Sequence, residues 1–105
     1  MDETTRLAEQ RILEWESRLK HIDELMERAA RAQAIGSAEA GARDRLRQAR
    51  ERRDRLAQEV QSLRERGAQA SDEVIARSGG LRKMLDLLGQ ELSNLLTQGP
   101  RARAE

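Results

Sequence analysis

Apolar side chains recur along the first third of the chain at alternating steps of four and three residues. On an α-helix this spacing gathers them into one stripe, which is typical of a helix that packs against other helices. The stripe consists of Ala8, Ile12, Trp15, Leu19, Ile22, Met26 and Ala29. We therefore predict a first helix over residues 3–34, with Trp15 as its main core anchor.

The same spacing returns in two later segments. The second stripe is thin and contains Ala42, Leu46, Ala49, Leu56, Val60 and Leu63. The third contains Val74, Ser78, Leu81, Leu85, Leu88, Leu92 and Leu95. These patterns predict helices over residues 38–66 and 72–98.

Turn-forming residues separate the three patterns. Gly36 suits the left-handed position after a helix, and Ser37 suits the N-cap of the next, so the pair predicts a tight connection. Gly67 marks the end of the second helix, and Ser71 is a candidate N-cap for the third. Connections this short make consecutive helices antiparallel neighbours.

Two glycine-containing pairs fall within or after the third pattern. Gly79-Gly80 lies off the stripe, so we expect the helix to continue or to kink there. Gly99-Pro100 predicts a helix stop, followed by a disordered tail over residues 99–105.

Three helices of similar length with short turns predict an all-α, three-helix up-down-up bundle with coiled-coil packing, as one domain over residues 1–98. The alternative is a long helical hairpin, with one unbroken helix from 38 to 98 completed by dimerisation. The spacing of apolar residues shifts in phase between the second and third stripes. This shift is what a turn would leave, and a stutter in a continuous coiled coil would look the same.

Composition supports the helical prediction. Charged and apolar residues each make up 37% of the 105 residues, and Trp15 is the only aromatic side chain. The net charge of +1 favours no partner by simple attraction. No apolar run approaches the ~20 residues of a membrane span, the start MDETTRL is not a secretory signal, and cysteine is absent. We expect a cytoplasmic protein without a membrane span.

The sequence contains few groups that could support catalysis. His21 is the only histidine, and it projects away from the apolar stripe of the first helix. No second histidine, cysteine or phosphate-binding glycine loop accompanies it. We therefore expect no enzyme activity, no catalytic residues, no metal site and no cofactor.

The third helix carries more large apolar residues than the thin second helix can cover. The first helix can supply the difference through Trp15, Ile22 and Met26, or another chain can cover it. Leu13 and Leu87 are expected to point outward. The predicted partner-binding residues are Leu81, Leu85, Leu88, Leu92, Leu95 and Leu96.

Arginine is concentrated in residues 43–55, where seven arginines stand against three acids. Such a segment can bind phosphate. The possible anion-binding residues are Arg43, Arg45, Arg47, Arg50, Arg52 and Arg55. Interleaved acids and pairs four residues apart, such as Glu27–Arg31 and Glu14–Arg18, instead favour a solvated helix surface.

Arg53 lies on the apolar stripe of the second helix. Its stem can pack on the core while its charged head reaches water. It can also pair with a carboxylate on a facing helix, or fix the register of the helices.

These patterns predict a non-catalytic structural or adaptor protein whose apolar helix faces bind another protein or a second copy of the chain. One alternative is an arginine-rich helix that binds nucleic acid or an anionic surface. Another is a small helical chaperone that shields an amphipathic client helix.

Overall fold

The computed structural model describes residues 2–35 and 40–104. Its elements are α1 (Glu3–Ile35), α2 (Ala40–Arg66), the 3₁₀ helix η1 (Gly67–Ala70) and α3 (Ser71–Ala104). The described residues contain no strand, so the prediction of an all-α protein is confirmed. The predicted connection at Gly36 and Ser37 lies outside the described residues.

The carboxylate of Asp2 caps the start of α1. Its Oδ1 accepts a hydrogen bond from the backbone N–H of Thr5 at 2.7 Å. The first N–H groups of a helix have no partner within the helix, so this bond satisfies one of them. The same bond lowers the pKa of the Asp2 carboxyl below its ordinary value.

A sharp bend at η1 turns the chain between α2 and α3. Gly67 adopts a φ of +62°, a left-handed conformation that favours glycine. The Ser71 hydroxyl donates to the Ala68 carbonyl at 2.9 Å, so it stabilises the bend instead of accepting from the N–H groups of α3. Asp72 and Glu73 occupy the first turn of α3, where negative charge is favoured.

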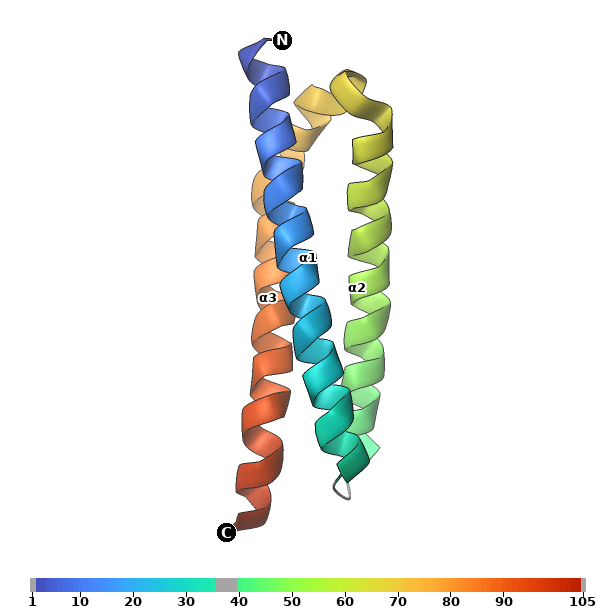
Figure 1. The fold of residues 1–105 in the computed structure, drawn as a ribbon, viewed down its shortest axis with the longest axis vertical. Helices are drawn as coiled ribbons and strands as arrows, with labels where there is room; N and C mark the ends of the chain where they lie inside the picture. Colours follow the sequence, from blue (N-terminus) through green and yellow to red (C-terminus); the bar gives the residue numbers. More distant parts are fainter. Residues whose placement is uncertain (1, 36–39, 105) are drawn as a thin grey trace.

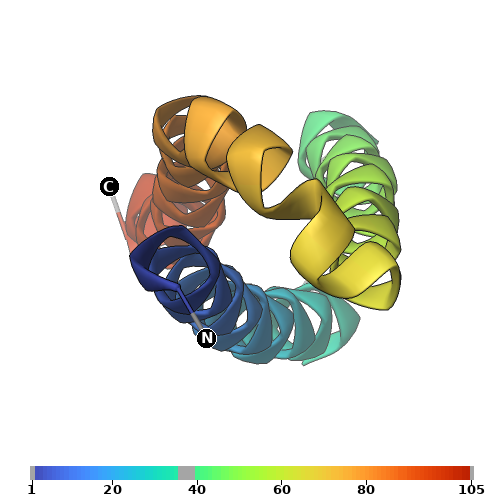
Figure 2. The same cartoon turned by 90° about the horizontal axis from the view of Figure 1, so that it is seen from above.

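The bend brings α3 back alongside α1, while α2 runs in the opposite direction (Figure 1). Seen along the axis, the three helices surround a common centre (Figure 2). The molecule measures 56 × 19 × 17 Å, whereas one straight helix over residues 40–104 would be about 98 Å long. Residues 40–104 are therefore one helical stretch folded at η1, and not one straight helix.

The core combines the three predicted stripes. The α1–α3 contact is the most extensive of the helix–helix contacts, and Trp15 of α1 is buried with 1% of its surface exposed. The buried apolar residues are Ala8, Ile12, Trp15, Leu19, Ile22, Leu25, Met26, Ala29, Leu46, Ala49, Leu56, Val60, Leu63, Ala70, Val74, Leu81, Leu85, Leu88 and Leu92. Leu25 joins them from outside the predicted α1 stripe.

The third helix does not end where the sequence predicts. α3 runs through Gly79-Gly80 without interruption, and it continues past the expected stop at residue 98 to Ala104. Pro100 removes one helical hydrogen bond, and a proline ring within a helix crowds the carbonyl four residues earlier, at a cost of about 3 kcal/mol. The arginine and alanine residues that follow it are strong helix formers, and they allow the helix to continue.

Candidate interaction surfaces

The leucines predicted as partner contacts lie mainly inside the molecule. Leu81, Leu85, Leu88 and Leu92 are buried, while Leu95 and Leu96 are partly buried against the same core. Buried residues of α1, among them Trp15 and Ile22, belong to the same cluster. The surplus apolar surface of α3 is therefore covered by the chain's own first helix, and four of these six leucines offer a partner no free surface.

Three large apolar side chains remain exposed among the described residues. Leu13 and Leu87 keep 58% and 59% of their surface in water, which agrees with the expectation that they point outward. Met84 is 52% exposed, although it stands three residues from Leu81 and four from Leu88, which are both buried. Met84 stands seven residues from both Arg77 and Glu91, which pair with α2, and the spacing within α3 alone does not show how far α2 covers this flank.

The arginine-rich segment does not form one cationic face. Arg47 pairs with Asp44 at 2.5 Å, and Arg52 pairs with Glu91 of α3 at 2.6 Å. The other candidate anion-binding residues make no ion pair with another residue of 2–35 or 40–104, and their helical spacing directs them to different sides of α2. They are Arg43, Arg45, Arg50 and Arg55. The six predicted residues are thus not brought together at one site.

Arg53 pairs with a carboxylate on a facing helix. Its Nε and Nη2 donate to the two oxygens of Asp23 on α1, at 2.7 and 2.9 Å. A third bond reaches Asp54 at 3.1 Å. The hydrogen bonds to Asp23 raise the pKa of the Arg53 guanidinium above its ordinary value. Of the alternatives left open by the sequence, the structure shows the interhelical ion pair.

Further ion pairs connect all three helices. Arg64 of α2 donates two hydrogen bonds to Glu16 of α1, at 2.5 and 2.6 Å. Arg18 of α1 pairs with Asp86 of α3, and Arg77 of α3 pairs with Glu59 of α2.

Ion pairs within single helices are only partly as expected. The predicted pair Glu27–Arg31 forms within α1. Arg18, expected to pair with Glu14, instead pairs with Asp86 on another helix, and Glu14 pairs with Arg11. Charges on the flanks of the apolar stripes thus hold the helices in register.

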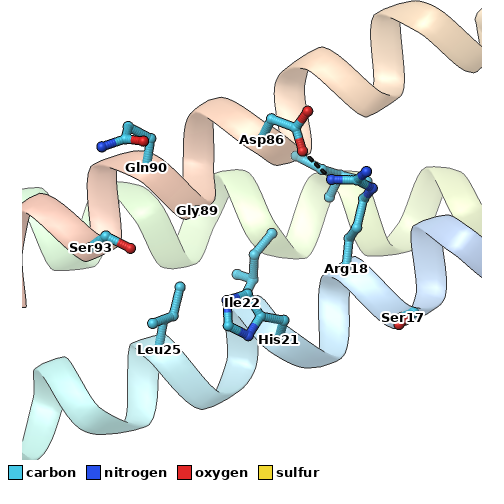
Figure 3. Close-up of a pocket in the computed structure, with 10 residues that line it drawn as sticks. Ser17, Arg18, His21, Ile22, Leu25, Asp86, Gly89, Gln90 and Ser93 are labelled. Atoms are coloured by element: carbon cyan, nitrogen blue, oxygen red, sulfur yellow. Dashed lines mark hydrogen bonds and ion pairs between the residues drawn. The ribbon is translucent and has the colours of Figure 1, made fainter.

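A groove of about 520 Å³ lies between α1 and α3 (Figure 3). Ile22, Leu25 and Leu85 form its apolar part. Gly89 leaves space on the α3 side, because no neighbouring atom lies within 4 Å of where its Cβ would be. The polar lining residues are Ser17, Arg18, His21, Asp86, Gln90 and Ser93.

The chemistry available in this groove is limited. The exposed His21 lies near the Arg18–Asp86 ion pair, whose dashed contact is visible in Figure 3. Within residues 2–35 and 40–104, no group of three histidine, cysteine or acidic side chains is placed to hold a metal ion. The groove therefore provides hydrogen-bonding groups around a small apolar floor.

In the part of the chain that the structure describes, no helix is long and apolar enough to cross a membrane. Comparisons with protein-family models, curated proteins and solved structures find no match for the chain.

Proposed function

We propose that the chain is a three-helix up-down-up bundle with coiled-coil packing, and that it works as a non-catalytic adaptor. In this proposal it binds another protein through apolar helix positions that its own core leaves exposed. The observation that carries the proposal is the exposure of Met84 and Leu87, three residues apart on α3. Large apolar side chains grouped on a charged surface are a common feature of protein interaction sites.

The composition of the core supports this proposal, because residues of a single chain form the whole apolar cluster. The buried residues of α1, α2 and α3 form one apolar cluster. Among the described residues, no buried side-chain nitrogen or oxygen lacks a hydrogen-bond partner. A second chain is therefore not needed to complete the fold, and Met84 and Leu87 remain available for a different protein.

The interhelical ion pairs support an adaptor role in a second way. Arg53–Asp23 and Arg64–Glu16 are two-point contacts that fix both distance and orientation between α1 and α2. A rigid support lowers the entropy that is lost when a partner binds. The proposed setting is the cytoplasm, because the chain contains no cysteine that would need an oxidising compartment.

Binding to a peptide panel tests the proposed function. Three labelled amphipathic helical peptides would share one apolar face and carry glutamate, glutamine or lysine on the polar face. We expect saturable binding of at least one peptide, measured by fluorescence anisotropy. Binding should be lost in the triple variant Leu13→Gln, Met84→Gln, Leu87→Gln, whose changes are all at exposed sites.

The control for this experiment is the variant Arg43→Gln, Arg50→Gln, which removes two arginines that pair with no other described residue. It should bind the peptides as the parent does. Binding by none of the three peptides would contradict the adaptor proposal. Binding that survives the triple variant would contradict the assignment to exposed apolar positions.

A further inference from the structure

The seam between α2 and α3 is closed by ion pairs at two points and open between them. Arg77 pairs with Glu59 near one end, and Glu91 pairs with Arg52 at 2.6 Å near the other. Met84 lies midway, seven residues from Arg77 and from Glu91, so all three share one stripe of α3. Met84 is 52% exposed, so this middle part of the seam is covered only in part.

Beyond Met84, the exposed surface of α3 carries a second large apolar side chain and a shallow hollow that only α3 residues line. Leu87 is 59% exposed and lies one turn further along α3. A shallow hollow of about 450 Å³ is lined by Gly79, Arg82, Lys83, Asp86, Leu87 and Gln90. No neighbouring atom lies within 4 Å of where a Cβ would be on Gly79 or Gly80. The backbone of another helix could therefore approach α3 closely at this point.

On α3, the charges around Met84 and Leu87 that lack a close partner are positive. The carboxylates of Asp86, Glu91 and Glu59 are each paired with an arginine of a neighbouring helix. Lys83 makes no ion pair with another described residue, and Arg82 reaches Asp86 only at 3.9 Å. This part of α3 thus presents apolar side chains beside cations without close partners.

Arg55 adds a cation from the α2 side of the seam. It follows Arg52 by three residues and precedes Glu59 by four, so it lies next to the two α2 residues that pair with α3. Arg55 has no ion-pair partner within residues 2–35 and 40–104. Glu51, four residues before Arg55, also makes no ion pair with another described residue. A second copy docked through the same seam would bring Arg55 and Lys83 against their own counterparts, which is electrostatically unfavourable.

We propose that the α2–α3 seam at Met84 and Leu87 docks an amphipathic helix of a partner protein that carries carboxylates beside its apolar stripe. The apolar stripe of the partner packs on Met84 and Leu87, next to the space above Gly79 and Gly80. Its carboxylates pair with Lys83 and Arg55. This inference rests on the proposed adaptor function, and it names the surface and the chemistry of the partner.

The glutamate-bearing peptide of the panel tests this docking site. We expect it to bind more tightly than the glutamine and lysine peptides, with an affinity that falls as salt is raised. The variant Met84→Gln, Leu87→Gln should weaken binding by about tenfold or more, because it removes both apolar anchors. The variant Arg55→Gln, Lys83→Gln should weaken binding and reduce its salt dependence.

Two further variants provide matched controls. Leu13→Gln removes an equally exposed apolar side chain on α1, and it should leave binding unchanged. Gly80 is exposed, and no described neighbouring atom lies within 4 Å of where its Cβ would be, so Gly80→Leu should keep the helix content measured by circular dichroism while it blocks the close approach of a partner. Loss of binding in Gly80→Leu with intact helicity supports the seam.

The outcomes separate this inference from the adaptor proposal. Equal or tighter binding of the glutamine or lysine peptide, or binding that depends on Leu13, overturns the acidic-helix inference but leaves the adaptor proposal standing. Binding of the acidic peptide that is unaffected by the Met84 and Leu87 changes overturns the seam assignment. Absence of binding by all three peptides overturns both proposals.

Discussion

Arg53 shows how a charged residue can occupy a core stripe without destabilising the fold. Its stem lies on the apolar stripe of α2, and its side chain stays 30% exposed. Both oxygens of Asp23 accept hydrogen bonds from the guanidinium, so the charge is compensated where it leaves the core. Partly exposed pairs contribute modestly to stability, because water competes for the same hydrogen bonds.

The two members of this pair should respond differently to mutation. Asp23→Ala leaves the guanidinium on the stripe without its main partner, and it should lower the free energy of unfolding by about 1 kcal/mol. Arg53→Met should change it by less, because methionine suits an apolar stripe and Asp23 can be solvated. Urea unfolding measures both values. A larger loss in Arg53→Met than in Asp23→Ala would contradict this explanation.

The Asp2 cap predicts a local pH dependence at the start of α1. Its pKa is lowered in the folded chain, so the contribution to stability is present above the ordinary pKa of 3.8. That contribution is lost as the pH falls through the lowered value, where the carboxylate becomes protonated. The protection of the Thr5 amide, taken relative to the intrinsic exchange rate at each pH, should therefore fall in acid. Asp2→Asn keeps an acceptor that does not titrate, and it should abolish this dependence; an unchanged profile would argue against the cap.

At the scale of helices, the periodicity of apolar residues predicted the core well, and the flanks less well. Residues such as Trp15, Ile22 and Leu88 repeat at helical spacing because burial on one face requires it. The exposure of Met84 depends on which flank of α3 is covered by α2, and one helix's pattern does not contain that information. The pairing of Arg18 with Asp86 likewise depends on the register between helices that are far apart in sequence.

Glycine substitutions distinguish the interior of α3 from the bend at η1. Gly79→Ala and Gly80→Ala should each raise the free energy of unfolding by about 1 kcal/mol, because both sites are helical and have space for a Cβ. Gly67→Ala should lower it by about 1 kcal/mol, since φ is +62° there. Thermal melts followed by circular dichroism report all three. Destabilisation by Gly79→Ala would show that α3 is not a regular helix at that position.

At the scale of the whole molecule, α3 contributes both to the core and to the proposed docking surface. Its inner face completes the core with α1, and its outer flank carries Met84 and Leu87. Core packing and the proposed docking thus use different sides of one helix. A partner that binds the outer flank does not have to displace any core residue.

Adjacent leucines of α3 allow these two sides to be tested separately. Leu88 is 2% exposed, so Leu88→Asp should unfold the chain, at a cost on the order of 4 kcal/mol or more. Leu87→Asp changes a 59% exposed residue, so it should keep the helix content while it weakens the binding of the acidic peptide. Circular dichroism compares the two variants. Equal tolerance of both substitutions would mean that the leucine face is not the core.

Light scattering across a wide concentration range tests most directly whether one chain completes its own core. We predict a single mass near 11.9 kDa at every concentration, with a melting temperature that does not depend on concentration. A mass that rises towards a dimer, together with a melting temperature that rises with concentration, would contradict the account. The leucine-rich face of α3 would then be an interface between chains.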